Sequence, residues 1–194
     1  MVTIREEKIT DADPREALLD VAYGEARITK TSERLREGRL PADGLSLVAV
    51  ERGRIVGTVR LWQVTAGPGR PALLLGPLAV DPAQRNRGIG STLVRRAIAQ
   101  ARMAGHRAIL LVGDAPYYGR FGFTAAKTGE LWMPGRFERD RLLALELKPE
   151  ALAGARGLIA ATGRLAQAPD LAALVAQDRR AQSTRVRAHR AFAA

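Results

Sequence analysis

The sequence predicts a mixed α/β fold in which two neighbouring parallel strands flank a basic helix. Residues 72–80 form a continuous apolar run, and a run of this length is typical of a buried central strand. A loop rich in glycine and arginine follows, and residues 91–104 then carry apolar side chains at helical spacing. A second apolar run at residues 108–112 comes after the helix. This order of strand, helix and strand favours a parallel pair.

The N-terminal part predicts one strand and two helices. Residues 2–8 alternate weakly between apolar and polar side chains, as in a half-buried strand. Asp13 followed by proline, with Glu16 three positions after the aspartate, is typical of a helix start. We expect this helix to stop near Gly24 and a second, short helix to cover residues 32–37.

A hairpin is expected before the central strand. Residues 45–50 and 54–64 have strand composition, and Arg52-Gly53 between them is a tight-turn signal. Residues 65–71 contain glycines and prolines and predict a loop.

Gly76-Pro77 interrupts the apolar run of the central strand. Proline has no N–H for a ladder hydrogen bond, and glycine in a strand often marks a bulge. The alternative is a strand that simply ends at Leu75. Apolar residues resume directly at Leu78, so we favour a bulge that leaves backbone groups free for a ligand.

Further elements are expected after residue 112. Asp114 is placed to cap a short helix, and residues 121–124 then predict a turn into another strand. Residues 141–147 alternate and predict the last strand.

The composition changes at Pro149, so we predict a domain over residues 1–149 and an Ala/Arg-rich extension over residues 150–194. Residues 169–181 have a helical pattern, and a basic tail follows. This extension either packs across the sheet edge or contacts a second copy in a homodimer, or it serves as a nucleic-acid contact or as a lid over the acceptor groove.

The composition of the 194 residues restricts the function classes. The chain has no cysteine, and its two histidines lie far apart, so no thiol nucleophile and no metal site are expected. We find no apolar run long enough for a membrane span and no signal-peptide pattern, and therefore expect a cytoplasmic protein. The net charge of +11 indicates either an anionic partner or the arginine-rich usage of a GC-rich genome.

The loop at residues 84–90 is a candidate anion site. It contains Arg85, Arg87, Gly88 and Gly90 and opens the predicted helix. Unpaired N–H groups and the positive end of the helix dipole favour an anion, and glycine lets a phosphate approach the backbone. The loop has neither the lysine of a Walker loop nor the first glycine of a dinucleotide fingerprint. We therefore predict a different polyanion site, such as one for a pyrophosphate.

Two motifs in this order carry a resemblance to a known family. Arg85-x-x-Gly88-x-Gly90 after GPLAVDP resembles motif A of the GNAT superfamily of N-acetyltransferases. Tyr118, Gly122 and Phe123 match the spacing of that superfamily's Tyr-x-x-x-Gly-Phe segment, in a form similar to the bacterial YhbS-like branch. The resemblance covers roughly residues 2–148. It implies a largely antiparallel sheet with one splayed parallel pair and flanking helices.

The resemblance also implies a site for acetyl-CoA as co-substrate. The backbones of Leu78 and Val80 would pair with the pantetheine arm in the splay. Backbone N–H groups of the loop would bind the pyrophosphate, with Ser91 as the helix cap and Arg87 near the adenosine 3′-phosphate. The implied cofactor-binding residues are Leu78, Ala79, Val80, Arg85, Asn86, Arg87, Gly88, Ile89, Gly90 and Ser91.

Tyr118 matches the position of the superfamily's general acid. A phenol within reach can protonate a thiolate as it leaves. The alternative is that Tyr118 only packs with the neighbouring phenylalanines. The general base is left open: Glu25, Glu51 and Glu130 are distant candidates, and deprotonation through ordered water is the other route.

The expected function is transfer of an acetyl group from acetyl-CoA to a primary amine of a small molecule, an amino acid or a peptide or protein. Without a cysteine, direct attack in a ternary complex is expected. One alternative is a non-catalytic acyl-CoA-binding regulatory module. The other is an acetyltransferase for an RNA-linked amine such as aminoacyl-tRNA, although no aromatic residues interleave the basic tail.

Overall fold

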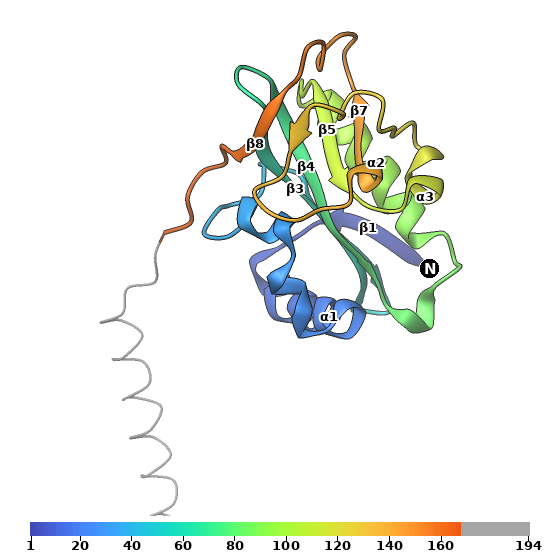
Figure 1. Ribbon diagram of the computed structural model, residues 1–194. Helices are drawn as coiled ribbons and strands as arrows, with labels where there is room; N and C mark the ends of the chain where they lie inside the picture. Colours follow the sequence, from blue (N-terminus) through green and yellow to red (C-terminus); the bar gives the residue numbers. More distant parts are fainter. Residues whose placement is uncertain (168–194) are drawn as a thin grey trace, which may run out of the picture. The chain divides into compact units, whose positions relative to one another are not determined.

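The computed structural model describes residues 1–167 and builds them around one twisted sheet (Figure 1). The path through the sheet is β1-β2-β3-β4-β5-β7, and β8 joins it beside β3 and also pairs with β6. The strands are β1 (Val2–Glu6), β2 (Ser46–Glu51), β3 (Arg54–Ala66), β4 (Pro71–Val80), β5 (Ala108–Val112), β6 (Leu131–Trp132), β7 (Leu142–Glu146) and β8 (Gly157–Ala161).

Helices lie against this sheet and in its connections. The α-helices are α1 (Ala12–Tyr23), α2 (Ile89–Met103) and α3 (Ala115–Gly119). Short 3-10 helices cover Ile9–Asp11, Glu25–Thr29, Thr31–Leu35, Pro82–Gln84 and Arg139–Arg141. None of the helices in residues 1–167 has the length and apolar character needed to cross a membrane.

The strand pairings confirm the predicted sheet. The pairs β1–β2, β2–β3, β3–β4 and β5–β7 are antiparallel, whereas β4 and β5 on either side of α2 are parallel. The sheet is therefore largely antiparallel and contains the expected parallel pair at its centre.

The predicted bulge in the central strand is present. Between the opposed pairs Val59–Leu78 and Leu61–Leu75, β3 has one residue and β4 has two. Gly76, the first of these two, has a φ of +138°, which a residue with a Cβ rarely adopts. The extra residue lets β4 bend without leaving β3, so pairing resumes and continues to the end of the strand.

On its other side β4 separates from β5. The parallel register holds Leu73 against Ile109 and Leu74 against Leu110, and no later pair joins these two strands in the described residues. The remainder of β4 thus has a partner on the β3 side only. The predicted splay of the parallel pair follows directly from this short register.

Both faces of the sheet are buried. Successive side chains of each central strand point to opposite faces and therefore enter two separate cores. Leu73 and Leu75 of β4 belong to the core under α2, together with Leu93 of that helix. Leu74 belongs to the core of the opposite face, together with Leu152 from the segment after β7.

Two helix starts differ from those predicted. α1 begins at Ala12 with Asp11 as its N-cap, so Asp13 lies in the first turn. α2 begins at Ile89 rather than at residue 91, and its N-cap is Gly88 in the left-handed region at a φ of +74°. Ser91 is consequently the third residue of the helix and not its cap.

Two short segments near the site also depart from prediction. The predicted helix at residues 32–37 is the 3-10 helix Thr31–Leu35. The turn at residues 121–124 does not lead directly into a strand, because Thr124 pairs only through an isolated bridge to Ala144.

The domain boundary predicted at residue 149 is wrong. β8 pairs antiparallel with β3 and parallel with β6, so residues beyond Pro149 complete the sheet. The compact unit runs from Met1 to Arg164. The helical pattern at residues 169–181 and the basic tail lie outside the described residues.

A pair of neighbouring substitutions in β8 tests this boundary. Ile159 is fully buried, whereas 53% of the surface of Leu158 is exposed. Ile159→Ala is expected to lower the free energy of unfolding by about 2–5 kcal/mol, because it leaves a cavity in the core. Leu158→Ala is expected to cost less than about 1 kcal/mol. Urea denaturation of the full chain measures both, and an unchanged main transition for Ile159→Ala would contradict the placement of β8 in the domain.

Candidate active site

The glycine- and arginine-rich loop and the start of α2 border a cavity of about 430 Å³. The first N–H groups of α2 have no partner within the helix, and its first turn has no acidic residue. Helix dipole and free donors thus both favour an anion there. The cavity is lined by Val80, Gln84, Arg85, Asn86, Gly88, Ile89, Gly90, Ser91, Tyr117 and Arg120.

Gly90 lines this cavity at a position where a side chain would clash with its neighbours. A Cβ at this position would lie 2.9 Å from the Tyr117 hydroxyl oxygen and 3.5 Å from Val80 Cγ2. The residue therefore lets the first turn of α2 approach both neighbours closely. Since Tyr117 comes from α3, this contact joins two elements that the sequence separates by a strand.

Arg87 and Arg120 differ in whether their side chains border this cavity. Arg87 makes two hydrogen bonds to Glu51, at 2.9 and 3.0 Å, and does not line the cavity. Arg120 does line it, and its guanidinium lies 4.5 Å from the centre of the Tyr117 ring. The basic side chains available to an anion are thus those of Arg85 and Arg120. The family resemblance implies a place for Arg87 near the adenosine 3′-phosphate, and no motif in the sequence points to Arg120.

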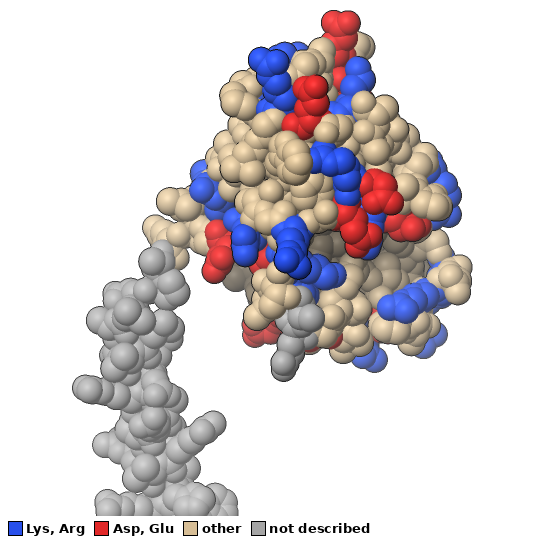
Figure 2. Space-filling view, in the orientation of Figure 1, with Lys and Arg blue, Asp and Glu red and all other residues tan. Residues whose placement is uncertain are grey.

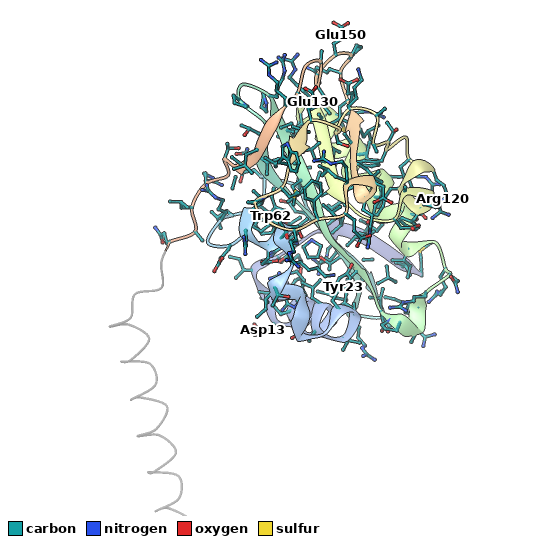
Figure 3. All side chains as sticks on the ribbon, in the orientation of Figure 1. Asp13, Tyr23, Trp62, Arg120, Glu130 and Glu150 are labelled. Carbon is teal, nitrogen blue, oxygen red and sulfur yellow. The ribbon has the colours of Figure 1, made fainter. Side chains whose placement is uncertain are left out.

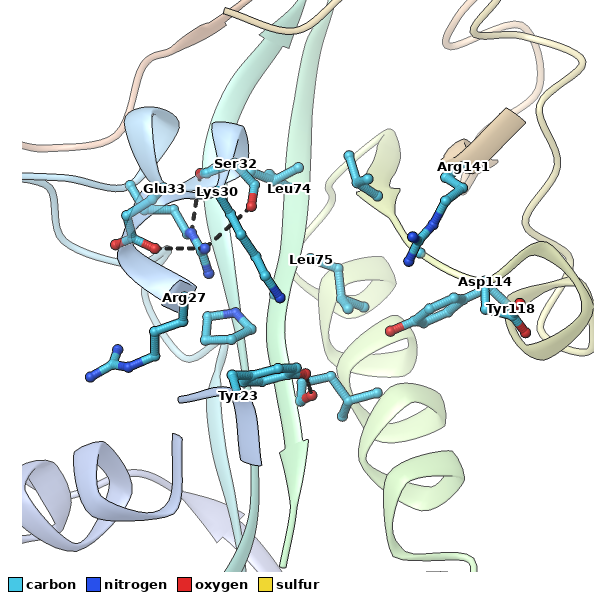
Figure 4. Close-up of a pocket in the computed structure, with 16 residues that line it drawn as sticks. Tyr23, Arg27, Lys30, Ser32, Glu33, Leu74, Leu75, Asp114, Tyr118 and Arg141 are labelled. Carbon is cyan, nitrogen blue, oxygen red and sulfur yellow. Dashed lines mark hydrogen bonds and ion pairs between the residues drawn. The ribbon is translucent and has the colours of Figure 1, made fainter. Parts of the chain in front are cut away.

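A second cavity, of about 240 Å³, lies where β4 and β5 separate (Figure 4). One wall is the stretch of β4 at residues 74–78 with its bulge, and the other is the end of β5 with Asp114 and Tyr118. Tyr23 and the segment that follows α1 lie across the opening from Tyr118 (Figure 4). The splay therefore creates an open space beside the free edge of β4.

Packing fixes the position of Tyr118. Asp114 caps α3 by accepting a hydrogen bond from the Tyr117 N–H at 2.9 Å. A Cβ at Gly113 would lie only 2.3 Å from Tyr118 Cε2, so this glycine makes room for the ring. The ring also meets Phe123 edge-on at 5.9 Å. Within the described part of the chain the Tyr118 hydroxyl makes no hydrogen bond, and it points into the cavity (Figure 4).

The electrostatic surroundings keep this phenol protonated. Burial raises the pKa of Tyr118 well above its usual range, and the neighbouring Tyr23, Tyr117 and Asp114 add to the rise. A phenol whose ionised form is disfavoured holds its proton at neutral pH. Tyr118 can therefore act as a proton donor in the cavity.

The backbone of β4 alternates between the two sides of the strand. The carbonyl of Leu78 accepts a hydrogen bond from the Tyr23 hydroxyl, so it faces the open side and not β3. The N–H of Asp81 donates to Val56 in β3 at 3.0 Å. Leu78 and Val80 thus present backbone groups to the open side, whereas Ala79, between them, faces β3.

Two of the carboxylates considered as a general base, Glu51 and Glu130, do not stand free in the described part of the cavity. Glu51 is paired with an arginine, and Glu130 lines neither cavity and lies away from Tyr23 (Figure 3). The side chain of Glu25 is outside what the structure describes. Asp81 caps the turn after β4, and Asp114 caps α3, as the sequence indicates.

Several residues of the site carry no signal in the sequence. Tyr23, Lys30 and Arg141 line the second cavity, but they come from two segments without a recognisable motif. Gly113 also belongs to no motif, because its contact with Tyr118 depends on the path of α3.

The raised pKa of Tyr118 is directly testable by titration. An unperturbed tyrosine ionises near pH 10, so the phenolate of Tyr118 should form at higher pH than that. Because the folded protein holds this proton more tightly than the unfolded chain, the associated stability is lost as the pH rises above about 10. Near-ultraviolet absorbance follows the phenolate, and Tyr118→Phe should remove the most alkaline step. If Tyr118→Phe instead removed an ionisation step near pH 10, the burial of the Tyr118 phenol would be contradicted.

Comparison with known proteins agrees with this geometry. The sequence model of the acetyltransferase (GNAT) family matches residues 13–123. The uncharacterized N-acetyltransferase YhbS of Escherichia coli K12 is 30% identical over 161 residues, which are 80% of this chain and 93% of YhbS.

Two solved structures are similar over most of their length. The crystal structure of Escherichia coli YhbS in complex with CoA matches with a TM-score of 0.70 and 30% identity, and the match covers 83% of this chain and 89% of the YhbS chain. A GNAT acetyltransferase from Brucella melitensis in complex with acetyl-CoA has a TM-score of 0.63 and 30% identity, and it covers 84% and 96%. With its splayed parallel pair and its glycine-rich helix start, the chain belongs to the acetyltransferase (GNAT) family.

Proposed function

We propose that the protein transfers an acetyl group from acetyl-CoA to a primary amine. The observation that carries this proposal is the arrangement of the two cavities along the open edge of β4. Val80 and Tyr117 line the cavity at the loop, and Leu78 and Tyr118 line the cavity at the splay. A ligand with phosphates at one end and a thioester at the other end of an uncharged arm fits this order. The relatives in complex with CoA and acetyl-CoA support the same donor.

The loop cavity suits the phosphates of such a donor. The N–H groups at the start of α2 point toward it, and Arg85 and Arg120 add positive charge. Gly88 has open space where a Cβ would be, so a phosphate can approach the backbone there. We assign the pyrophosphate to residues 85–91 without the side chain of Arg87, which Glu51 holds.

The free edge of β4 suits the pantetheine arm. Leu78 and Val80 have backbone groups on the open side, and an arm with amide groups can pair with them as a short extra strand would. In this arrangement an amide N–H of the arm replaces the Tyr23 hydroxyl on the Leu78 carbonyl. The thioester then lies beside Tyr118.

In the proposed reaction, acetyl-CoA supplies an acetyl group activated as a thioester. A bond forms between the amine nitrogen and the acetyl carbon, and the bond from carbon to sulfur breaks. Tyr118 donates its proton to the leaving sulfur, which has a pKa of about 8.5 as a free thiol. Water in the open cavity accepts the proton that the amine loses and returns a proton to the Tyr118 phenolate, which restores the phenol, and we assign no side chain as the base.

A non-catalytic acyl-CoA-binding module is the second candidate. The observation that favours it is that, among the described side chains, the two carboxylates that line the splay cavity, Glu33 and Asp114, both have partners already. The protonated phenol of Tyr118 in the same cavity argues for catalysis. The two candidates differ in turnover and not in binding.

Replacement of the proposed acid tests catalysis. Tyr118→Phe keeps the ring that packs on Phe123 but removes the proton donor. The turnover number should fall by about 10²- to 10⁴-fold in a thiol-release assay with acetyl-CoA and a panel of amines. The affinity for acetyl-CoA and the melting temperature should stay unchanged, as measured by calorimetry. Full turnover by the variant would rule out this role for Tyr118, and binding without turnover of any amine by the wild type would favour the second candidate.

A matched pair of variants at Gly88 tests the phosphate site. Asparagine and aspartate have the same shape, and both tolerate the left-handed conformation found at this position. Gly88→Asp adds a negative charge where we place the pyrophosphate, and CoA binding should weaken by about 100-fold. Gly88→Asn should weaken it much less. Titration calorimetry with CoA measures both, and equal affinities for the two variants would contradict the placement.

A further inference from the structure

Basic side chains outnumber acidic ones around the splay cavity. Both carboxylates there are already engaged, because Glu33 pairs with Arg36 at 2.7 Å and Asp114 accepts the Tyr117 N–H at 2.9 Å. The charged residues that line this cavity are Arg27, Lys30, Glu33, Arg36, Asp114 and Arg141. Positive charge therefore remains without a balancing group.

Two of the four basic residues are neutralised by neighbours. Arg27 pairs with Glu16 at 2.5 Å and with Asp20 at 2.8 Å, and its guanidinium is turned away from the cavity (Figure 4). Arg36 is held by Glu33, and its Nε also donates to a backbone carbonyl at 3.2 Å. Neither is available to a ligand without losing these contacts.

The other two basic residues face each other across the opening. The Lys30 ammonium lies 4.4 Å from the centre of the Tyr23 ring and points into the cavity (Figure 4). Among the described side chains, no carboxylate lies within 4.0 Å of it. Arg141 extends from the opposite wall, and within residues 1–167 the ion pair found for it is a 3.4 Å contact with the largely exposed Glu138.

The electrostatics agree with this geometry. Burial lowers the pKa of Lys30, and the positive charges of Arg36 and Arg141 lower it further. Two cations that repel each other across a cavity gain stability when an anion lies between them. The site thus has the charge arrangement of an anion-binding site that is separate from the phosphate loop.

Lys30 and Arg141 also line a neighbouring cavity of about 410 Å³, which extends outward past Arg136. They therefore stand at the junction between the chamber that holds Tyr118 and an outer groove. Both basic and acidic side chains border a hollow in the middle of this face of the molecule (Figure 2). An acceptor that enters by the groove passes between the two cations before its amine reaches Tyr118.

We propose that the acceptor is an amine that also carries an anionic group, a carboxylate or a phosphate, and that Lys30 and Arg141 hold this group. The inference rests on the proposed acetyl transfer and names its substrate class. Arg141 offers a planar fork that matches either anion, and Lys30 offers a compact point charge. An acceptor with several positive charges meets repulsion at the same place.

In the thiol-release assay, each anionic amine is compared with a counterpart in which an uncharged group replaces the anionic group, and this counterpart is called the uncharged amine. α-Amino acids are paired with their amides, and O-phosphoethanolamine is paired with ethanolamine. We expect kcat/KM to be about 10- to 100-fold higher for one anionic set, mainly through KM. The set that is preferred distinguishes a carboxylate from a phosphate. Equal rates for the anionic and the uncharged member of every pair would overturn the proposal.

Variants of the two cations locate the effect. Lys30→Met and Arg141→Met should each remove most of this preference while the rates with the uncharged amines change less than about twofold. Lys127→Met is the control, because Lys127 is exposed and lines neither cavity. Equal losses with anionic and uncharged amines would indicate a structural role instead and would overturn the assignment.

A binding measurement separates failure of this inference from failure of the proposed function. The protein loaded with CoA is titrated in a calorimeter with the amino acids and with O-phosphoethanolamine. Binding to the wild type that is lost in Lys30→Met supports the anion site even if no amine is acetylated, in which case the proposed transfer fails alone. If none of these anionic amines binds to the wild type, the anion site is refuted whether or not other amines are turned over.

Discussion

The structure depends on one constraint, which is that β4 must stay in the sheet on one side and leave it on the other. Its pairing with β3 continues past the bulge to Val80, whereas its pairing with β5 ends at Leu74. The bulge carbonyl of Gly76 is not left without a partner, because Trp62 Nε1–H donates to it at 2.6 Å. The core thus supports an open strand edge whose backbone groups gain most from an added ligand.

The distribution of charge follows from this open edge. The groups that we propose to bind anions lie toward its two ends, with the first turn of α2 and Arg120 at one end and with Lys30 and Arg141 at the other. The stretch of β4 between them carries no charged side chain, as an uncharged arm requires. Part of the net charge of +11 therefore comes from basic residues that border the two cavities, and the rest is spread over the arginine-rich chain.

Features encoded by contiguous residues could be predicted from the sequence, and features that depend on distant contacts could not. The bulge and the cap at Asp114 are each set within a few residues, and the parallel pair follows from the direct order of strand, helix and strand along the chain; the structure has all three. The orientation of Arg87 depends on Glu51, which lies 36 residues earlier, and no local pattern indicates that contact. β8 escaped prediction because glycine and alanine frame a short apolar core, so composition resembled that of an appended segment.

The same reasoning explains why the donor is easier to infer than the acceptor. The donor side is built largely from one stretch, residues 78–91, in which strand, loop and helix start follow each other directly. The proposed acceptor side joins the segment after α1 with Arg141 before β7, and more than 100 residues separate them. Their spacing is fixed only when β4 and β5 are in register, so acceptor specificity is a property of the folded sheet. It can accordingly change through single substitutions at the opening without disturbing the donor site.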